Sequence, residues 1–139
     1  MVTEIVRRHL NQPAKKVALV TLFLYLCLGY FLKIQLNFDR QNWTENFPVM
    51  RGYLRAAHVH GLTLSFLLIF YSFLIEFSGL GEKIKKVAVT LAICGCVLMP
   101  LTLVLSAFNI KIMILSHLSV IMILTAVGIL AVAHLRKKI

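Results

Sequence analysis

Acidic residues are scarce in this chain: Asp and Glu together number 5, against 15 Lys and Arg, and charged residues of both signs make up only 14% of the 139 residues. Because 60% of the residues are hydrophobic, a domain of this length has too little charge to cover a water-exposed surface. The scarcity excludes an ordinary water-soluble domain. A nucleic-acid partner is excluded as well, because the basic residues lie in short clusters between apolar runs and not on a face interleaved with aromatic residues.

Cysteine is also rare, and all three copies fall inside apolar runs: Cys27, Cys94 and Cys96. The odd number and the apolar surroundings argue against a disulfide framework. Cys94 and Cys96 are two residues apart on an expected helix, so they point to different faces. We interpret all three as small apolar residues within a membrane.

Four long apolar runs occupy most of the chain. They predict transmembrane helices at about residues 17–36, 54–77, 87–108 and 112–134. Each run is close to the ~20 residues that a helix needs to cross the hydrocarbon core, and a helix satisfies its own backbone hydrogen bonds in lipid. The sequence therefore predicts an all-α protein, a four-helix transmembrane bundle that forms a single domain over residues 1–139 and lies in the lipid bilayer.

Short basic segments predict the orientation. Positive charges cluster before the first run, between the second and third, and after the fourth; they include Arg7, Arg8, Lys15, Lys16, Lys83, Lys85, Lys86, Arg136, Lys137 and Lys138. Basic segments of this length remain in the cytoplasm. We therefore expect a multi-pass protein of the cell inner membrane with both termini cytoplasmic. Residues 34–54 and the short turn 109–111 then lie on the outer side.

Three of the five histidines lie near the outer starts of the expected spans. His58 and His60 follow the outer start of the second span, and His117 follows the outer start of the fourth. With a rise of ~1.5 Å per residue, all three are expected at one depth. Ionisable groups within a membrane are costly unless they have partners, so these three are candidate functional residues. His9 and His134 are expected at or outside the membrane surface.

The helical period assigns faces to these histidines. At about 100° per residue, His58 shares a face with Ser65, Ser72 and Glu76, and polar residues indicate the inward side of a membrane helix. His60 points roughly the opposite way, toward lipid, a partner chain or a second site.

On the fourth span, His117 shares its face with Gly128 and Ala131, small residues that let helices approach closely. We therefore expect His58 and His117 to form an inward-facing pair. Gly29 and Gly61 would leave room beside them.

Two imidazoles from two membrane helices can hold a heme iron from both sides. Arg51 and Arg55 lie just outward of His58, where they can bind the heme propionates. We therefore predict a heme, heme b, bound by His58 and His117, with His60 as a further candidate ligand. Which residue of the His-x-His pair faces His117 is left open. A copper ion held by all three histidines, or a purely packing role, are the alternatives.

The stretch RAAHVHGL at residues 55–62 resembles the Ala-His-x-His stretch of heme-copper oxidase subunit I, in which two histidines of one helix ligate two different hemes. The layout also resembles an uncharacterised family of small bacterial four-helix membrane proteins in the same superfamily, with His-x-His opening the second helix and one histidine opening the fourth. These resemblances imply a heme-binding four-helix membrane protein. The oxidase's copper-site histidines and cross-linked tyrosine have no counterparts here, so oxygen reduction is not implied.

The leading functional prediction is a small b-type cytochrome that exchanges electrons with a quinone or another respiratory partner and forms a homo-oligomer. One alternative is a heme-modifying or quinol-linked membrane enzyme similar to half of a heme A synthase. The signature of that enzyme's second helix is missing, because Val59 follows His58 and Gly61 follows His60. The other alternative is a cofactor-free assembly or structural subunit of a respiratory complex. No catalytic residue is assigned, and enzymatic activity stays open.

Overall fold

The computed structural model describes the backbone of residues 2–39, 41, 45 and 47–136, and their side chains from Pro13 onward. It has four long helices and two short 3-10 segments: α1 (Val2–Phe38), α3 (Pro48–Leu74), η1 (Ile75–Phe77), α4 (Glu82–Ser106), η2 (Ile110–Met113) and α5 (Ile114–Arg136). The side chains of Arg7, Arg8, His9 and residues 137–139 lie outside the described part.

Four stretches of these helices are long and apolar enough to cross a membrane: Pro13–Phe38, Pro48–Phe77, Glu82–Ser106 and Ile110–Arg136. For the described residues, this confirms the prediction of an all-α fold with four helices that are suited to cross a membrane. The second and third helices begin earlier than predicted, because helical hydrogen bonding continues beyond the apolar core. Pro48 occupies the first turn of α3, where its fixed φ and missing N–H suit a helix start.

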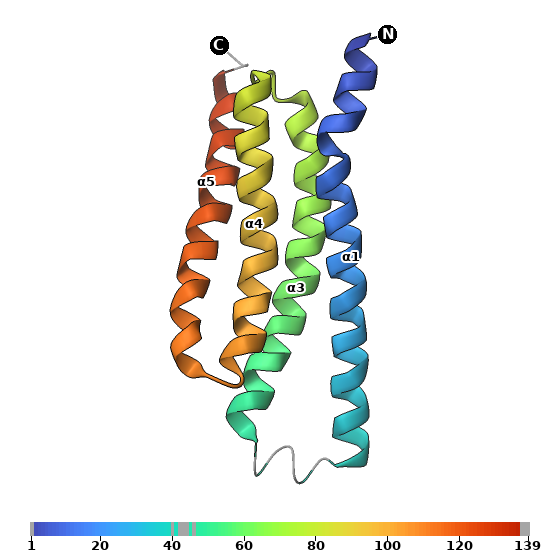
Figure 1. Cartoon of the computed structure of the whole chain (residues 1–139), viewed down its shortest axis with the longest axis vertical. Helices are drawn as coiled ribbons and strands as arrows, with labels where there is room; N and C mark the ends of the chain where they lie inside the picture. The colour runs from blue at the N-terminus through green and yellow to red at the C-terminus, as the bar shows by residue number, and fades with distance from the viewer. Residues whose placement is uncertain (1, 40, 42–44, 46, 137–139) are drawn as a thin grey trace.

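The helices form an elongated bundle in which α3 lies between α1 and α4, and α4 lies between α3 and α5 (Figure 1). The beginning of α1, the connection between α3 and α4 and the end of α5 lie together at one end, which we call the termini end. The connection from α1 to α3 and the turn at η2 lie at the other, the loop end. Gly79, with φ of 71°, lets the chain reverse between η1 and α4.

Small residues allow α1 and α3 to approach closely. Ala14 and Ala18 are fully buried, and the ring of Tyr25 packs directly against Gly61 of α3. The hydroxyl oxygens of Thr21 and Ser65 lie 2.8 Å apart across the same interface. The polar face predicted for α3 is thus a packed face, and it packs on α1.

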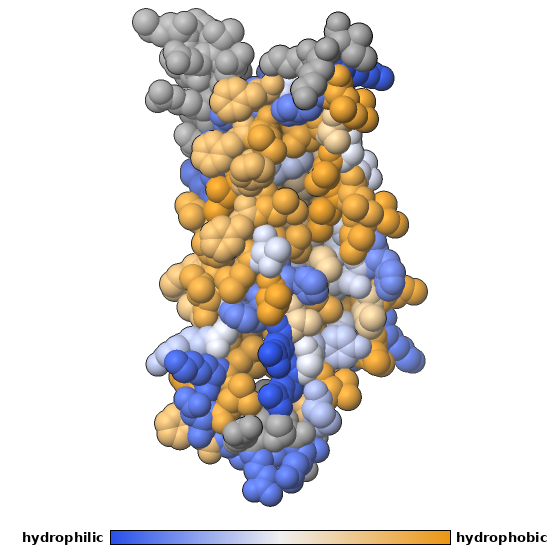
Figure 2. All heavy atoms as spheres, turned by 180° about the vertical axis from the view of Figure 1, so that it is seen from behind, coloured by the Kyte–Doolittle hydropathy of each residue, from blue (hydrophilic) through white to orange (hydrophobic). Residues whose placement is uncertain are grey.

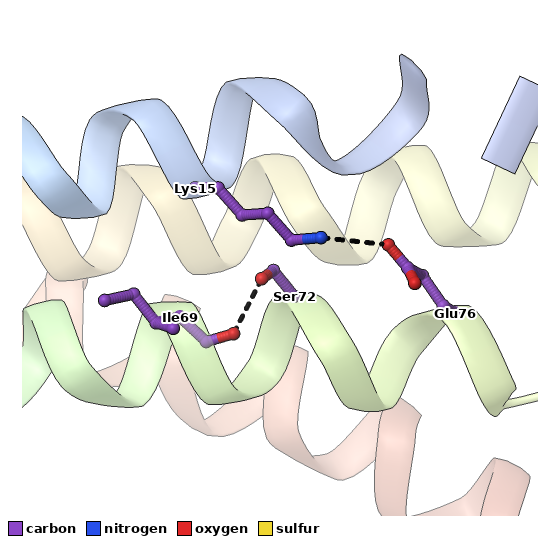
Figure 3. Close-up of polar contacts among 4 residues, drawn as sticks. All are labelled: Lys15, Ile69, Ser72 and Glu76. Atoms are coloured by element: carbon purple, nitrogen blue, oxygen red, sulfur yellow. Dashed lines mark hydrogen bonds and ion pairs between the residues drawn. The ribbon is translucent and has the colours of Figure 1, made fainter. Parts of the chain in front are cut away.

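At the termini end, an ion pair joins α1 to η1, which directly continues α3 (Figure 3). The Lys15 Nζ lies 3.3 Å from Glu76 Oε1 and 4.5 Å from the centre of the Phe73 ring. Below it, the Ser72 hydroxyl donates to the Ile69 carbonyl of its own helix at 2.6 Å. The Glu76 carboxylate therefore helps to hold α1 against α3 at this end.

At Gly95, α4 and α5 are in close contact. A Cβ at this position would lie 2.6 Å from Ile123 Cγ1 and 2.9 Å from the Ser119 carbonyl oxygen. We expect Gly95→Ala to destabilise the protein by about 1–3 kcal/mol, because the backbone of α5 must shift to make room. The measurement is the melting temperature in detergent. Gly52→Ala is the control, since a Cβ at Gly52 meets nothing within 4 Å; equal melting temperatures for the two variants would contradict the close approach.

The surface matches the predicted environment. Large apolar side chains are exposed around the middle of the bundle, among them Phe23, Phe66, Phe70 and Leu124. Figure 2 shows that hydrophobic residues cover the middle of one face, whereas hydrophilic residues gather toward the loop end. Such a surface is suited to lipid, as expected for a multi-pass membrane protein.

Candidate functional site

A cavity of about 460 Å³ lies between α1 and α3 toward the loop end. We call it the loop-end pocket. Its lining combines an imidazole, three cations, an amide and apolar side chains: His58, Lys33, Arg51, Arg55, Asn37, Leu32, Leu36 and Gly29. The volume falls within the range of roughly 300–1,000 Å³ that is usual for cofactor and small-molecule sites. Three of the five predicted cofactor-binding residues, His58, Arg51 and Arg55, therefore meet at one pocket.

The ring of His58 is fixed by α1. Its Nδ1 lies 2.7 Å from the Tyr25 carbonyl oxygen. Because a carbonyl only accepts hydrogen bonds, Nδ1 must carry the proton, and Nε2 of the neutral ring keeps its lone pair. An imidazole with Nδ1–H bonded to a backbone carbonyl is the arrangement in which Nε2 is presented to a metal.

The absence of a side chain at Gly29 leaves the space that the His58 ring occupies. A Cβ at Gly29 would collide with His58 Cε1 and lie 2.7 Å from both ring nitrogens. The Cε1 edge therefore lies against the α1 backbone. The ring itself lines the loop-end pocket, together with Leu32 and Lys33 of α1.

The pocket has a strong excess of positive charge. No ion pair joins Lys33, Arg51 or Arg55 to any residue in the described part of the chain. Arg51 is half-buried, and Lys33 and Arg55 are exposed. Three cations converging without a counterion create a positive potential at the pocket, which favours an anionic ligand.

His60 and His117 lie elsewhere. His60 is exposed on α3, as predicted, and His117 is exposed on α5. The buried residues of α5 are Ser119, Ala126, Leu130 and Ala133. At about 100° per residue they lie about 160–220° around the helix from His117, so this histidine points away from the bundle.

The structure therefore does not bring His58 and His117 together within one chain. His58 faces α1, at the opposite side of the bundle from α5, and the prediction that His117 faces inward is wrong for the single chain. The face with Gly128 and Ala131 is exposed and does not pack on α4. Heme ligation by each histidine stays a prediction, but an internal pair on the second and fourth helices is not formed.

The copper alternative required three histidines at one place. Among the side chains that the structure describes, at residues 13–39, 41, 45 and 47–136, no three of His, Cys, Asp or Glu are grouped so that they could hold a metal ion. A metal site built only from this chain's side chains is therefore not supported by the geometry, whereas a heme needs only one or two protein ligands.

Three parts of the site were not predicted from the sequence: Lys33, Asn37 and the Tyr25 carbonyl. A signal was available: Gly29, Lys33 and Leu36 recur at the helical spacing of four and three residues, so they share one face of α1. A glycine leaves space beside a membrane helix. A positively charged residue on the same face, near the end of the helix, places a charge at the edge of that space.

No family model matches this chain, and comparison with curated proteins and with solved structures finds no match. The resemblance to heme-copper oxidase subunit I and to the small bacterial four-helix proteins therefore rests only on the RAAHVHGL stretch and the histidine layout.

Proposed function

We propose that this protein is a small heme-binding electron carrier of the cell inner membrane, with heme b in the loop-end pocket and His58 as an axial ligand. The observation that carries the proposal is the composition of that one pocket: His58 Nε2 with a free lone pair beside three cations, Lys33, Arg51 and Arg55, that have no counterion in the described chain.

Heme would use the imidazole, the cations and the apolar part of this lining. His58 would hold its iron, the arginines and Lys33 would pair with its propionates, and Leu32 and Leu36 would contact the macrocycle. An anionic lipid headgroup would use the cations but would not need a histidine fixed by a carbonyl. A quinol hydroxyl would use His58 but would leave the cations without an anion.

Within this proposal each residue of the chain has a defined task. The Tyr25 carbonyl and Gly29 orient His58, and the cations at the pocket rim bind carboxylates. Bound heme supplies reversible one-electron transfer. The electron-exchange partner that we propose is a quinone or a respiratory protein in the same membrane.

The proposed orientation places both termini in the cytoplasm and the pocket near the outer face. Five lysines in the described residues of the termini end support it: Lys15, Lys16, Lys83, Lys85 and Lys86. Short basic segments are retained on the cytoplasmic side.

The first test is the absorption spectrum of the full-length protein purified in detergent, oxidised and then reduced, with the heme content determined after extraction. We expect a Soret band, sharp visible bands on reduction and heme b as the extracted cofactor. A colourless protein that also takes up no added hemin would contradict heme binding and favour the cofactor-free assembly subunit. Conversion of the bound heme to a modified product in the presence of quinol would instead identify the enzymatic alternative.

A further inference from the structure

The loop-end pocket contains one side chain of the kinds that ligate heme iron. These kinds are His, Met, Cys and Tyr, and of the described residues lining the pocket only His58 belongs to them. An electron-carrying b-type heme is coordinated on both sides of the iron. If the proposed function holds, the second ligand has to reach the pocket from elsewhere.

His117 is a histidine without a role inside its own chain. It is exposed on the face of α5 that points away from α4, and its ring makes no hydrogen bond to any described residue. Its exposed neighbours are apolar: Ile114, Leu118, Ile121 and Leu124. An imidazole surrounded by lipid-facing side chains is unfavourable unless it meets a partner.

The two histidines lie at similar depth. The Tyr53 hydroxyl contacts Met113 Sδ at 3.2 Å, which aligns α3 with the start of the fourth span. His58 follows Tyr53 by five residues and His117 follows Met113 by four, which corresponds to ~7.5 Å and ~6 Å along the two helices. A second copy in the same membrane orientation would therefore present His117 near the level of the loop-end pocket.

The face that carries His117 is suited to close approach by another helix. A Cβ at Gly128 would meet nothing within 4 Å, and Ala131 is exposed beside it. Small residues at a membrane-facing position allow helix backbones to pack together. His60 differs, because its neighbours Gly61 and Leu64 are buried. It lies at the edge of a packed face, whereas His117 lies in the middle of an exposed one.

We propose that His117 of a second copy of this chain enters the loop-end pocket and completes the coordination of the heme that His58 binds. This inference rests on the proposed function. The heme site is then shared between two copies. Two copies are therefore the smallest assembly that forms a six-coordinate, low-spin heme.

Complementation between two defective chains tests the inference. His58→Ala and His117→Ala chains with different affinity tags are co-expressed, and mixed assemblies are isolated through both tags. Each variant alone is expected to lose the low-spin spectrum. In a symmetric pair, the mixed assembly keeps one intact site, His58 from one chain and His117 from the other, so about half of the wild-type low-spin heme should return.

Four outcomes decide between the alternatives. Recovery in the mixed assembly, together with new carbon monoxide binding by His117→Ala alone, supports the shared site. An unchanged low-spin spectrum in His117→Ala, or loss in His60→Ala instead, would overturn it while leaving heme binding intact. Loss in both variants without recovery on mixing would also overturn it. Wild-type protein that binds no heme would refute the proposed function itself. Size-exclusion profiles and melting temperatures establish that each variant is folded.

Discussion

Purified His58→Ala protein is expected to contain no stoichiometric heme. Among the described lining residues of one chain, His58 is the only side chain of a kind that ligates heme iron, and the substitution removes it. Loss of groups that only orient a metal ligand typically weakens metal binding 10–100-fold, and loss of the ligand itself should exceed that. The measurement is the heme-to-protein ratio after purification, with titration of added hemin to obtain the residual affinity.

Two controls make this result specific. His134→Ala alters a histidine whose Nδ1 lies 3.0 Å from the carbonyl oxygen of Leu130, one turn earlier in α5 at the termini end, so it should retain full heme content. His58→Ala itself should melt close to the wild-type apoprotein, because a half-buried side chain at the pocket is not part of the apolar core. Heme content that persists in His58→Ala would mean that the pocket is not where heme binds.

The four spans could be predicted from the sequence because apolar length alone determines them. The helix starts could not, since Glu82 and Pro48 begin helices outside the apolar runs, where hydrogen bonding and first-turn preferences decide. The sequence also does not predict that α1 continues through Pro13. A proline within a helical pattern can either end the helix or be accommodated in it.

The site was only partly predictable, for a different physical reason. Polar residues on a membrane helix mark its packed face, and this identified the face of His58 correctly: Ser65 lies beside Thr21 of α1. The polar pattern does not say which neighbour packs there. That depends on the order of helices around the bundle, and α1 occupies the place that the sequence interpretation gave to the fourth span.

The face of α5 was misassigned because apolar residues occur on all sides of that helix. Periodicity then carries little information, and Gly128 was taken as a packing residue of the bundle. In the structure Ser119 and Ala126 are buried instead: the Ser119 carbonyl lies next to Gly95 of α4, and the Ala126 carbonyl accepts a hydrogen bond from the Tyr71 hydroxyl of α3. Small residues on a membrane helix indicate a close contact, but they do not distinguish a contact within the chain from one between copies.

The second large effect is expected from Gly29→Ala. The added methyl group would collide with Cε1 of His58, so the ring must move away from α1. That movement breaks the 2.7 Å contact between Nδ1 and the Tyr25 carbonyl, which fixes the tautomer and direction of the ring. Weakening by a factor of 10–100 in heme affinity is expected, the range found when an orienting hydrogen bond to a metal ligand is lost.

Gly52→Ala is the matched control, because it makes the same chemical change in a helix near the loop end with open space around the new methyl group. It should bind heme as tightly as the wild-type protein. The two variants differ only in whether the methyl group touches His58, so a selective loss in Gly29→Ala ties heme affinity to the orientation of that ring. If both bind hemin with wild-type affinity and an unchanged spectrum, the contact between α1 and His58 does not position an iron ligand, and the imidazole held by Tyr25 has only a packing role.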